Sequence, residues 1–234
     1  MEFINTEVLE DADAQTFQNN HPYPWMSISN FLYEEKYQEL VNTLPESSLF
    51  TEKFGKKRKF GQQSHDRLSL EYDASLQLSP AWNTFIKELH SEAYRQFIQN
   101  MAGIKHLEIK LHWHYTPNGC SVSPHCDANR KIGSHIFYFN TEKDWDPSWG
   151  GDTLILDDNG KYSRNSNPKF SDFHSYQRAT ALGNNSLLFI RNGNSWHGVE
   201  EIKCPKGEYR KVLIVVINKM KTSAKIKKFL SLGH

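Results

Sequence analysis

Residues 107–127 read LEIKLHWHYTPNGCSVSPHCD, and the first nine of these positions alternate between apolar and polar side chains. The odd positions from Leu107 to Tyr115 are apolar, while the even positions carry charged residues or histidines. Successive side chains of a β-strand point to opposite faces of its sheet. This stretch therefore predicts a strand with one apolar and one polar face, followed by a turn at residues 116–119.

Outward from this strand, the pattern is helical toward the N-terminus and extended toward the C-terminus. Apolar residues at helical spacing predict helices over residues 33–44 and 80–101. Pro80 suits a first helical turn and Gly103 suits a C-cap. Residues 24–32 are interpreted as a short strand or an extended entry.

Four further segments predict strands because they are rich in β-branched and large apolar residues and are bounded by Gly, Asn, Asp or Pro. They are residues 134–140, 153–157, 186–191 and 210–218. Helices followed by many short strands indicate a mainly β fold, a sandwich or jelly roll with N-terminal helices packed on one sheet.

We find neither an internal repeat nor a low-complexity linker, which favours a single domain over residues 1–234. Its expected parts are a helical N-terminal part (1–104), a β core that carries the chemistry (105–219) and a basic C-terminal tail (220–234). The polar stretch 158–183 predicts a long loop, either functional or disordered.

The composition argues against several classes of protein. Hydrophobic residues make up 38% and charged residues 24%, as in a soluble globular protein, and a formal net charge of +1 gives no overall attraction to nucleic acid. The cysteines, Cys120, Cys126 and Cys204, have no repeated spacing, which favours a reducing compartment over a disulfide framework. Since no signal-peptide pattern and no long apolar run is present, we expect a cytoplasmic protein with neither a membrane nor a nucleic-acid partner.

The strongest chemical signal is His125-Cys126-Asp127, with His197 far downstream. Residues at i and i+2 of an extended segment point to the same side, so His125 and Asp127 can converge on one ion. Two histidines and one carboxylate on one face of an octahedron leave the opposite positions open, the arrangement of non-haem Fe(II) oxygenases. His197 follows another predicted strand and a turn, and we take these three residues as the candidate metal ligands.

Arg210 opens the last strong strand and has a specific use beside such a metal. A dicarboxylate that chelates iron at one end needs its far carboxylate neutralised, and a guanidinium can do so with two parallel hydrogen bonds. Lys211 points to the opposite face, so only one of the two can face inward.

Two other patterns have weaker functional readings. His112 and His114 resemble a cupin-like metal pair, but the expected downstream glutamate is missing, and surface or groove histidines fit better. The basic run of residues 53–59 fits a solvated, mobile loop, or else a lid that holds an anionic substrate or a nucleic-acid strand.

These residues lie in segments that resemble a known family. HYTPNG…SPHCD (114–127), HIFYFNTEKDWDPSWGGDTLIL (135–156) and NSLLFIRNGNSWHGVEEI…YRKVLIVVIN (185–218) resemble the Fe(II)/2-oxoglutarate-dependent dioxygenase superfamily, most closely its prolyl 4-hydroxylase-like branch. The resemblance implies a double-stranded β-helix with Fe(II) on His125, Asp127 and His197. It also implies that Arg210, Tyr115 and Tyr138 bind the cosubstrate 2-oxoglutarate.

The resemblance implies a hydroxylase that uses O₂ and 2-oxoglutarate and releases succinate and CO₂. Its substrate C–H stays open between a peptidyl proline, another amino-acid residue and a small molecule, because residues 1–104 do not match the family's peptide-binding elements. The alternative is a non-catalytic, cupin-like jelly-roll module that binds a metal or a sugar. The sequence does not indicate an oligomeric state.

Overall fold

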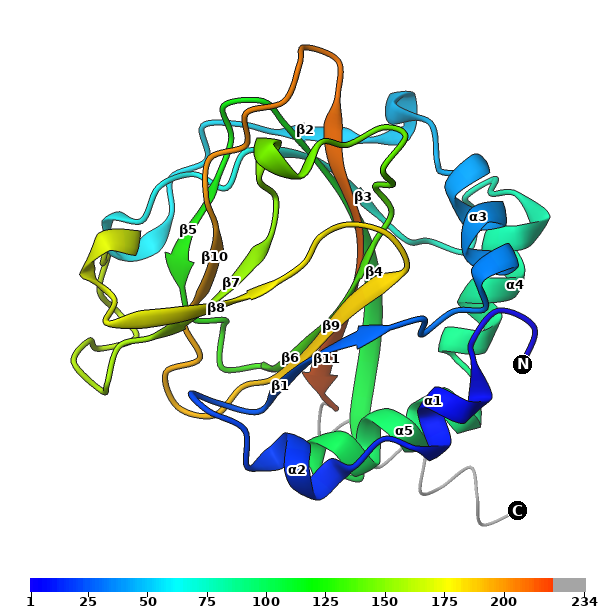
Figure 1. Cartoon of the computed structure of the whole chain (residues 1–234), viewed down its shortest axis with the longest axis horizontal. Coiled ribbons are helices and arrows are strands. Elements are labelled where there is room, and N and C mark those ends of the chain that lie inside the picture. Colours follow the sequence, from blue (N-terminus) through cyan, green and yellow to red (C-terminus); the bar gives the residue numbers. More distant parts are fainter. Residues whose placement is uncertain (221–234) are drawn as a thin grey trace.

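The computed structural model describes residues 1–220, so the predicted basic tail lies outside the described residues apart from its first position. Within residues 1–220 the strands form two antiparallel sheets of seven and four strands, which face each other as in a jelly roll (Figure 1). The large sheet has the order β1 (Trp25–Ser29), β9 (Asn185–Ile190), β6 (Lys131–Tyr138), β11 (Tyr209–Lys219), β4 (Leu107–Pro117), β3 (Arg67–Glu71), β2 (Thr51–Lys53). The small sheet has the order β5 (Val122–His125), β10 (His197–Val199), β7 (Thr153–Asp157), β8 (Ser175–Ala179). The predicted mainly β class is confirmed.

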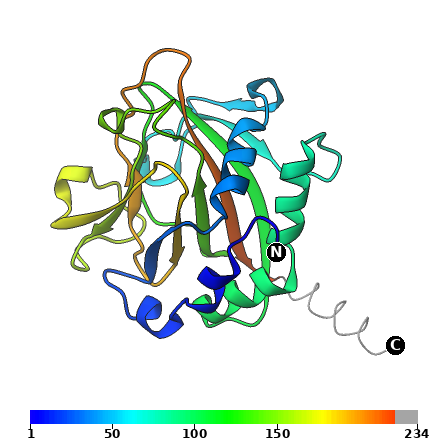
Figure 2. The same cartoon turned by 45° about the vertical axis from the view of Figure 1, so that its right-hand side comes forward.

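The helices lie on the outer side of the large sheet, away from the small one (Figure 2). They are α1 (Thr6–Glu10), α2 (Ala14–Gln18), α3 (Glu34–Asn42), α4 (Pro80–Leu89) and α5 (Glu92–Ala102). Short 3₁₀ turns are η1 (Ser47–Leu49), η2 (Lys59–Gly61), η3 (Pro147–Trp149) and η4 (Phe170–Asp172). None of the helices in the described part of the chain is both long enough and apolar enough to cross a membrane.

The single helix predicted over residues 80–101 is in fact two helices. α4 ends at Leu89, and the side chain of Ser91 accepts a hydrogen bond from the backbone N–H of Tyr94, which makes Ser91 the N-cap of α5. A serine hydroxyl at this position satisfies an otherwise unpaired N–H and so starts a new helix. Gly103 adopts the left-handed conformation at the end of α5, as predicted.

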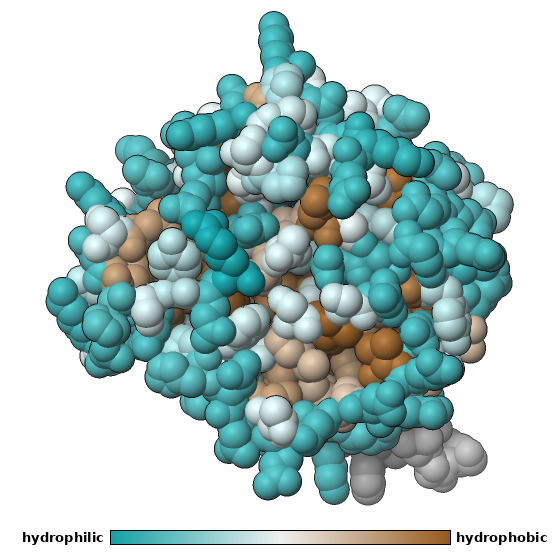
Figure 3. All heavy atoms as spheres, viewed as in Figure 1, coloured by the Kyte–Doolittle hydropathy of each residue, from teal (hydrophilic) through white to brown (hydrophobic). Residues whose placement is uncertain are grey.

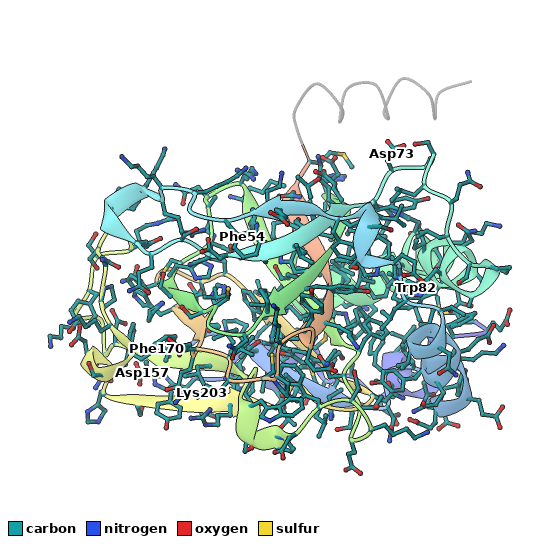
Figure 4. The ribbon with its side chains drawn as sticks, turned by 90° about the horizontal axis from the view of Figure 1, so that it is seen from above. Phe54, Asp73, Trp82, Asp157, Phe170 and Lys203 are labelled. Carbon is teal, nitrogen blue, oxygen red and sulfur yellow. The ribbon has the colours of Figure 1, made fainter. Side chains whose placement is uncertain are left out.

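The main hydrophobic core lies between the helices and the outer face of the large sheet. Trp82 of α4 packs on Trp113 of β4 and on Phe139, with ring centroids 5.3 and 5.1 Å apart. Figure 4 shows Trp82 on the helical side of the molecule, while Phe170 and Asp157 lie on the opposite side. Burial of these large rings supplies much of the driving force that fixes the helices on the sheet.

A smaller core lies between the two sheets and includes Tyr138, Ile155, Leu187 and Val212. Because the helical layer takes up the larger core, the space between the sheets is left free for polar side chains. On the face drawn in Figure 3, polar residues dominate and apolar ones gather near the centre.

The polar stretch 158–183 is more ordered than its weak periodicity predicts. It contains η4 and β8, and β8 pairs with β7 over five residues, Thr153–Asp157 opposite Ser175–Ala179. Four of the five side chains of β8 are exposed, so it lacks the apolar face by which a strand is recognised.

Candidate metal centre

The three predicted ligands come together at one end of the small sheet. His125 is the last residue of β5 and His197 is the first of β10, and these two residues are paired in the antiparallel register. Asp127 lies two positions beyond His125. One side-chain ligand atom from each of the three residues lies within 4.8 Å of the others, and all three residues are buried. Strand pairing therefore unites residues that are more than seventy positions apart in the sequence.

The two histidines are held in the orientation that metal binding requires. Nδ1 of His125 lies 3.0 Å from the carbonyl oxygen of Ser123, and Nδ1 of His197 lies 3.0 Å from that of Ser195. A carbonyl only accepts, so Nδ1 of each ring carries the hydrogen and Nε2 is left with a free lone pair. Burial lowers the pKa of both histidines, which keeps them in the neutral form that a metal needs.

The carboxylate of Asp127 is positioned by a neighbouring lysine. Nζ of Lys131 donates to Oδ1 of Asp127 at 2.9 Å, which leaves Oδ2 for another partner. Burial raises the pKa of Asp127, but nearby positive charge, first that of Lys131, and the hydrogen bond from Lys131 outweigh it and hold the pKa below its usual value. Two neutral imidazoles and one ionised carboxylate are the donor set that suits Fe(II), so the residues present fit the metal.

His125, Asp127 and His197 line a cavity of about 310 Å³. Arg210 of β11 lines the same cavity. The guanidinium donates through Nε to the carbonyl of Gly151 and through Nη2 to Oγ1 of Thr153, the latter at 3.0 Å. Tyr138 also donates to Oγ1 of Thr153, at 2.9 Å, and the ring of Tyr138 lies under the guanidinium. Arg210 is buried and forms no ion pair with any carboxylate in residues 1–220. Arg210 and Tyr138 thus lie together, with unused N–H groups on the arginine.

Gly151 has a clear steric role beside Arg210. Its φ of 103° lies in a region that other residues avoid, and a Cβ placed there would lie 3.3 Å from Cδ of Arg210. Glycine at this position therefore lets the chain enter β7 while Arg210 passes close to the backbone.

The structure does not bring Tyr115 to this cavity, and its predicted place beside the cosubstrate needs correction. Its hydroxyl donates to the carbonyl of Pro45 at 3.0 Å, and its ring stacks on Phe50 at 4.2 Å between centroids. The apolar face of β4 does point inward, but toward the helical layer. The polar face of β4 is the one that points between the sheets.

Several cavity residues have no place in the predicted site, and most of them lie on that polar face or in the basic segment before β3. They are Arg58, His65, Arg67, His114, Thr116, Lys131 and Thr153. The signal for His114 and Thr116 was the alternation of residues 107–117. A strand covered on its apolar face by helices presents its polar face to the space between the sheets.

The histidines of the cupin-like alternative do not form a metal site with other ligands. The rings of His112 and His114 lie 6.3 Å apart, and His125, Asp127 and His197 are the one set of three potential ligands that meets within the described part of the chain. His114 instead lines the cavity as a neutral side chain, because burial lowers its pKa well below the usual value.

Comparisons with known proteins agree with this geometry. A family model described as the 2OG-Fe(II) oxygenase superfamily matches residues 111–217, a range that includes the triad and Arg210. No curated protein sequence matches the chain.

Among solved structures, the chain is similar to a prolyl-4-hydroxylase from Pseudomonas putida, with TM-score 0.55, 13% identity and coverage of 91% of this chain and 100% of that one. It is also similar to a prolyl hydroxylase from Trichoplax adhaerens in complex with a hypoxia-inducible-factor oxygen degradation domain peptide fragment. The TM-score is 0.60 at 15% identity, with coverage of 97% of this chain and 94% of that one. A third similar structure is SnoN, a non-heme alpha-ketoglutarate-dependent epimerase from nogalamycin biosynthesis. The TM-score is 0.56 at 12% identity, with coverage of 92% of this chain and 84% of that one.

At these identities the solved structures share the fold, and their different reactions show that the fold alone does not set the substrate. The family match and the convergence of the triad carry the assignment. Residues 111–217 therefore match the 2OG-Fe(II) oxygenase superfamily, and this match together with the triad implies an enzyme that uses Fe(II) and 2-oxoglutarate.

Proposed function

We propose that this enzyme hydroxylates a C–H bond of a peptidyl residue or of a small molecule, with release of succinate and CO₂. The supporting observation is one cavity lined both by His125, Asp127 and His197 and by the buried Arg210. A non-catalytic metal-binding module would need the first feature only. A buried guanidinium without a carboxylate partner is unfavourable unless an anion neutralises it, so its presence favours an enzyme that binds an acidic cosubstrate.

Three residues would hold the iron, through Nε2 of His125, Nε2 of His197 and the oxygen of Asp127 that Lys131 leaves free. The bound Fe(II) and 2-oxoglutarate supply the oxidising chemistry, in which O₂ converts 2-oxoglutarate to succinate and CO₂ and one oxygen atom enters the substrate C–H bond. The backbone carbonyls behind the imidazoles and the ammonium of Lys131 keep the donor atoms oriented.

Arg210 would bind the far carboxylate of 2-oxoglutarate. Its hydrogen bonds to Gly151 and Thr153 fix the plane of the guanidinium and leave the other N–H groups for a carboxylate. Ile136 and Phe189 add apolar walls to the cavity. These walls exclude water, which strengthens the interaction between the guanidinium and its anion.

Anaerobic addition of Fe(II) and 2-oxoglutarate tests the proposal. The wild-type protein is expected to develop a weak visible charge-transfer band, and after admission of O₂ to form succinate even without a substrate. Asp127→Ala should abolish both signals because it removes the carboxylate ligand. Asp146→Ala, which changes an exposed aspartate at η3, is the matched control and should keep both.

A binding module would give neither the band nor succinate in the wild-type protein. Retention of the band in Asp127→Ala would also contradict the proposal, since the metal would then be bound elsewhere.

A further inference from the structure

Two arginines line the metal cavity from a part of the chain outside the family match. Arg58 lies just before η2 and Arg67 is the first residue of β3. Both belong to the segment that forms part of the cavity wall next to His125, since the ring of His65 lies 4.6 Å from that of His125. The predicted solvated loop over residues 53–59 thus contributes a side chain to the site.

Within the described residues neither arginine forms an ion pair with a carboxylate. Nη1 of Arg67 donates to the carbonyl of His65 at 2.6 Å, while Nε of Arg67 is buried without a hydrogen-bond partner. Arg58 reaches Oε1 of Gln62 only at 3.4 Å. The nearby Asp66 accepts from the backbone N–H of Gly55 and from Ser64 instead.

The arrangement of the two arginines would be stabilised by an anion. Burial lowers the pKa of both guanidinium groups, and the charge of Arg58 lowers that of Arg67 further. The charges of Asp127 and Asp66 raise the pKa of Arg58 and of Arg67, respectively, but offset the burial only in part. Two partly buried like charges with an unpaired Nε are unfavourable without a partner. His65 does not add to the charge, since burial lowers its pKa to about 3 and it stays neutral.

The charge balance of the whole cavity points the same way. Five cationic side chains line it, but one carboxylate does, Asp127. The cations are Arg58, Arg67, Arg130, Lys131 and Arg210. A divalent metal and the doubly charged 2-oxoglutarate cancel each other, so binding of both leaves the positive excess unchanged. A substrate that carries an anionic group would reduce this positive excess.

A second cavity, of about 670 Å³, adjoins the first and shares Arg67, His114, Arg130 and Lys131 with it. It continues along the inner face of the large sheet, where its lining carries six cationic side chains and only two carboxylates, Glu71 and Glu108. The first cavity has room for the cosubstrate and the reacting end of a substrate. The second offers a polar and mainly cationic extension for the rest of the substrate.

The two segments that border the arginines are fixed to each other. Nε2 of Gln62 donates to the carbonyl of Ser166 at 3.2 Å, and Nδ2 of Asn167 donates to the carbonyl of Gly61 at 2.8 Å. The cyan and yellow segments accordingly meet on one side of the molecule in Figure 1. Arg58 is therefore held at the cavity by contacts from the 158–183 stretch rather than by an acidic neighbour.

We propose that Arg58 and Arg67 bind an oxyanion of the substrate, a carboxylate or a phosphate, and so direct a nearby C–H bond toward His125, Asp127 and His197. This inference rests on the proposed function and names the substrate class of the same site. A pair of guanidinium groups suits such an oxyanion because each can donate two parallel hydrogen bonds.

The test uses calorimetric titration of the full-length protein, both loaded with Mn(II) and 2-oxoglutarate and free of them. The probes are two matched pairs, N-acetylalanine with N-acetylalaninamide and phenyl phosphate with phenol. We expect one anionic probe to bind and its neutral counterpart not to bind. The anionic probe with the higher affinity shows whether the arginines prefer a carboxylate or a phosphate. Arg58→Gln and Arg67→Gln should each weaken that probe by about tenfold to a hundredfold.

Three controls keep the outcome readable. Arg67→Lys keeps the charge but loses the paired donors, so we expect an intermediate loss of probe affinity. Lys56→Gln changes an exposed cation of the same segment and should have no effect. The affinity for 2-oxoglutarate should stay within about twofold in all four variants, because a separate arginine, Arg210, binds it.

Equal binding of anionic and neutral probes, undiminished anion binding in Arg58→Gln and Arg67→Gln, or no anion binding to the wild-type protein would overturn the inference. Failure of the proposed function looks different, since Mn(II) and 2-oxoglutarate would then not bind. The titrations of the unloaded protein decide the role of the two arginines in that case as well.

Discussion

Tyr138 and Tyr115 lie on strands that both flank β11, yet their hydroxyls point to opposite sides of the large sheet. Tyr138 donates to Thr153, which also accepts from Arg210, whereas Tyr115 donates to Pro45 below the helical layer. The first hydroxyl thus belongs to the proposed cosubstrate site and the second to the packing of the N-terminal part.

Phenylalanine substitutions separate these two roles. Tyr138→Phe removes the bond that orients Thr153 and Arg210, so we expect the Kd for 2-oxoglutarate to rise about threefold to tenfold. Tyr115→Phe should leave that Kd unchanged and lower the free energy of unfolding by about 1 kcal/mol. Calorimetric titration with Mn(II) present and denaturant unfolding measure the two quantities. A larger loss of 2-oxoglutarate affinity in Tyr115→Phe would restore the prediction that the structure corrects.

For single residues, the sequence predicts which side chains can bind a metal better than it predicts which way a side chain points. The convergence of His125, Asp127 and His197 followed from the i, i+2 spacing and from a third residue after a strand. Tyr115 was misplaced because alternation divides a strand into two faces without stating which face meets the metal. Arg58 was considered only within the alternative of a lid over an anionic substrate, because a basic run in a polar segment has no periodicity that shows which way its side chains point. Arg67 was not predicted as a site residue.

The contact between α5 and β6 buries a histidine, which makes the free energy of unfolding depend on pH. His135 of β6 is fully buried, its Nδ1 lies 3.0 Å from the hydroxyl of Tyr94 in α5, and its Nε2 lies 3.0 Å from Oγ of Ser186 in β9. Burial lowers the pKa of His135 to about 3. The imidazole therefore stays neutral in the folded protein, while it is protonated in the unfolded chain below about pH 6.5.

Because only the unfolded state takes up this proton between about pH 6.5 and pH 3, His135 destabilises the fold progressively as the pH falls. Its contribution is about 1.4 kcal/mol per pH unit below pH 6. We expect the slope of the free energy of unfolding against pH, measured by urea unfolding from pH 6 to pH 5, to become shallower by about that amount in His135→Gln. Glutamine keeps hydrogen-bonding capacity toward Tyr94 and Ser186.

His106→Gln, at an exposed position, is the control and should keep the wild-type slope. An identical slope in wild type and His135→Gln would mean that the α5–β6 contact admits water and the buried environment of His135 is wrong.

The elements that sequence patterns predict are those with a clear apolar pattern. β4, β6, β7, β9 and β11 were predicted to within a few residues, since each has an apolar face or two. The short strands β2, β5 and β10 offer too few positions for alternation to be recognised. The side chains of β8 are mostly exposed, so this strand has no apolar face. The break between α4 and α5 was missed because the apolar spacing continues across it, while the N-cap at Ser91 is a local signal.

In the whole molecule, the two faces of the large sheet have different roles. The outer face packs against the helices in the main core, and the inner face carries the cavity with its cationic lining. The chain has a formal net charge of only +1, so the positive excess of the cavity is a matter of placement rather than of composition. Composition could therefore not predict it, whereas the mainly β class and the N-terminal helical layer followed from the order of patterns along the chain.

One metal ion held by His125, Asp127 and His197 would face a cosubstrate anchored by Arg210. The most direct measurement is an anaerobic crystal structure of the protein with Fe(II) and 2-oxoglutarate. We predict one iron atom at bonding distance from Nε2 of His125, Nε2 of His197 and a carboxylate oxygen of Asp127, with the far carboxylate of 2-oxoglutarate on Arg210. An iron atom bound elsewhere, or 2-oxoglutarate whose far carboxylate avoids Arg210, would contradict the account.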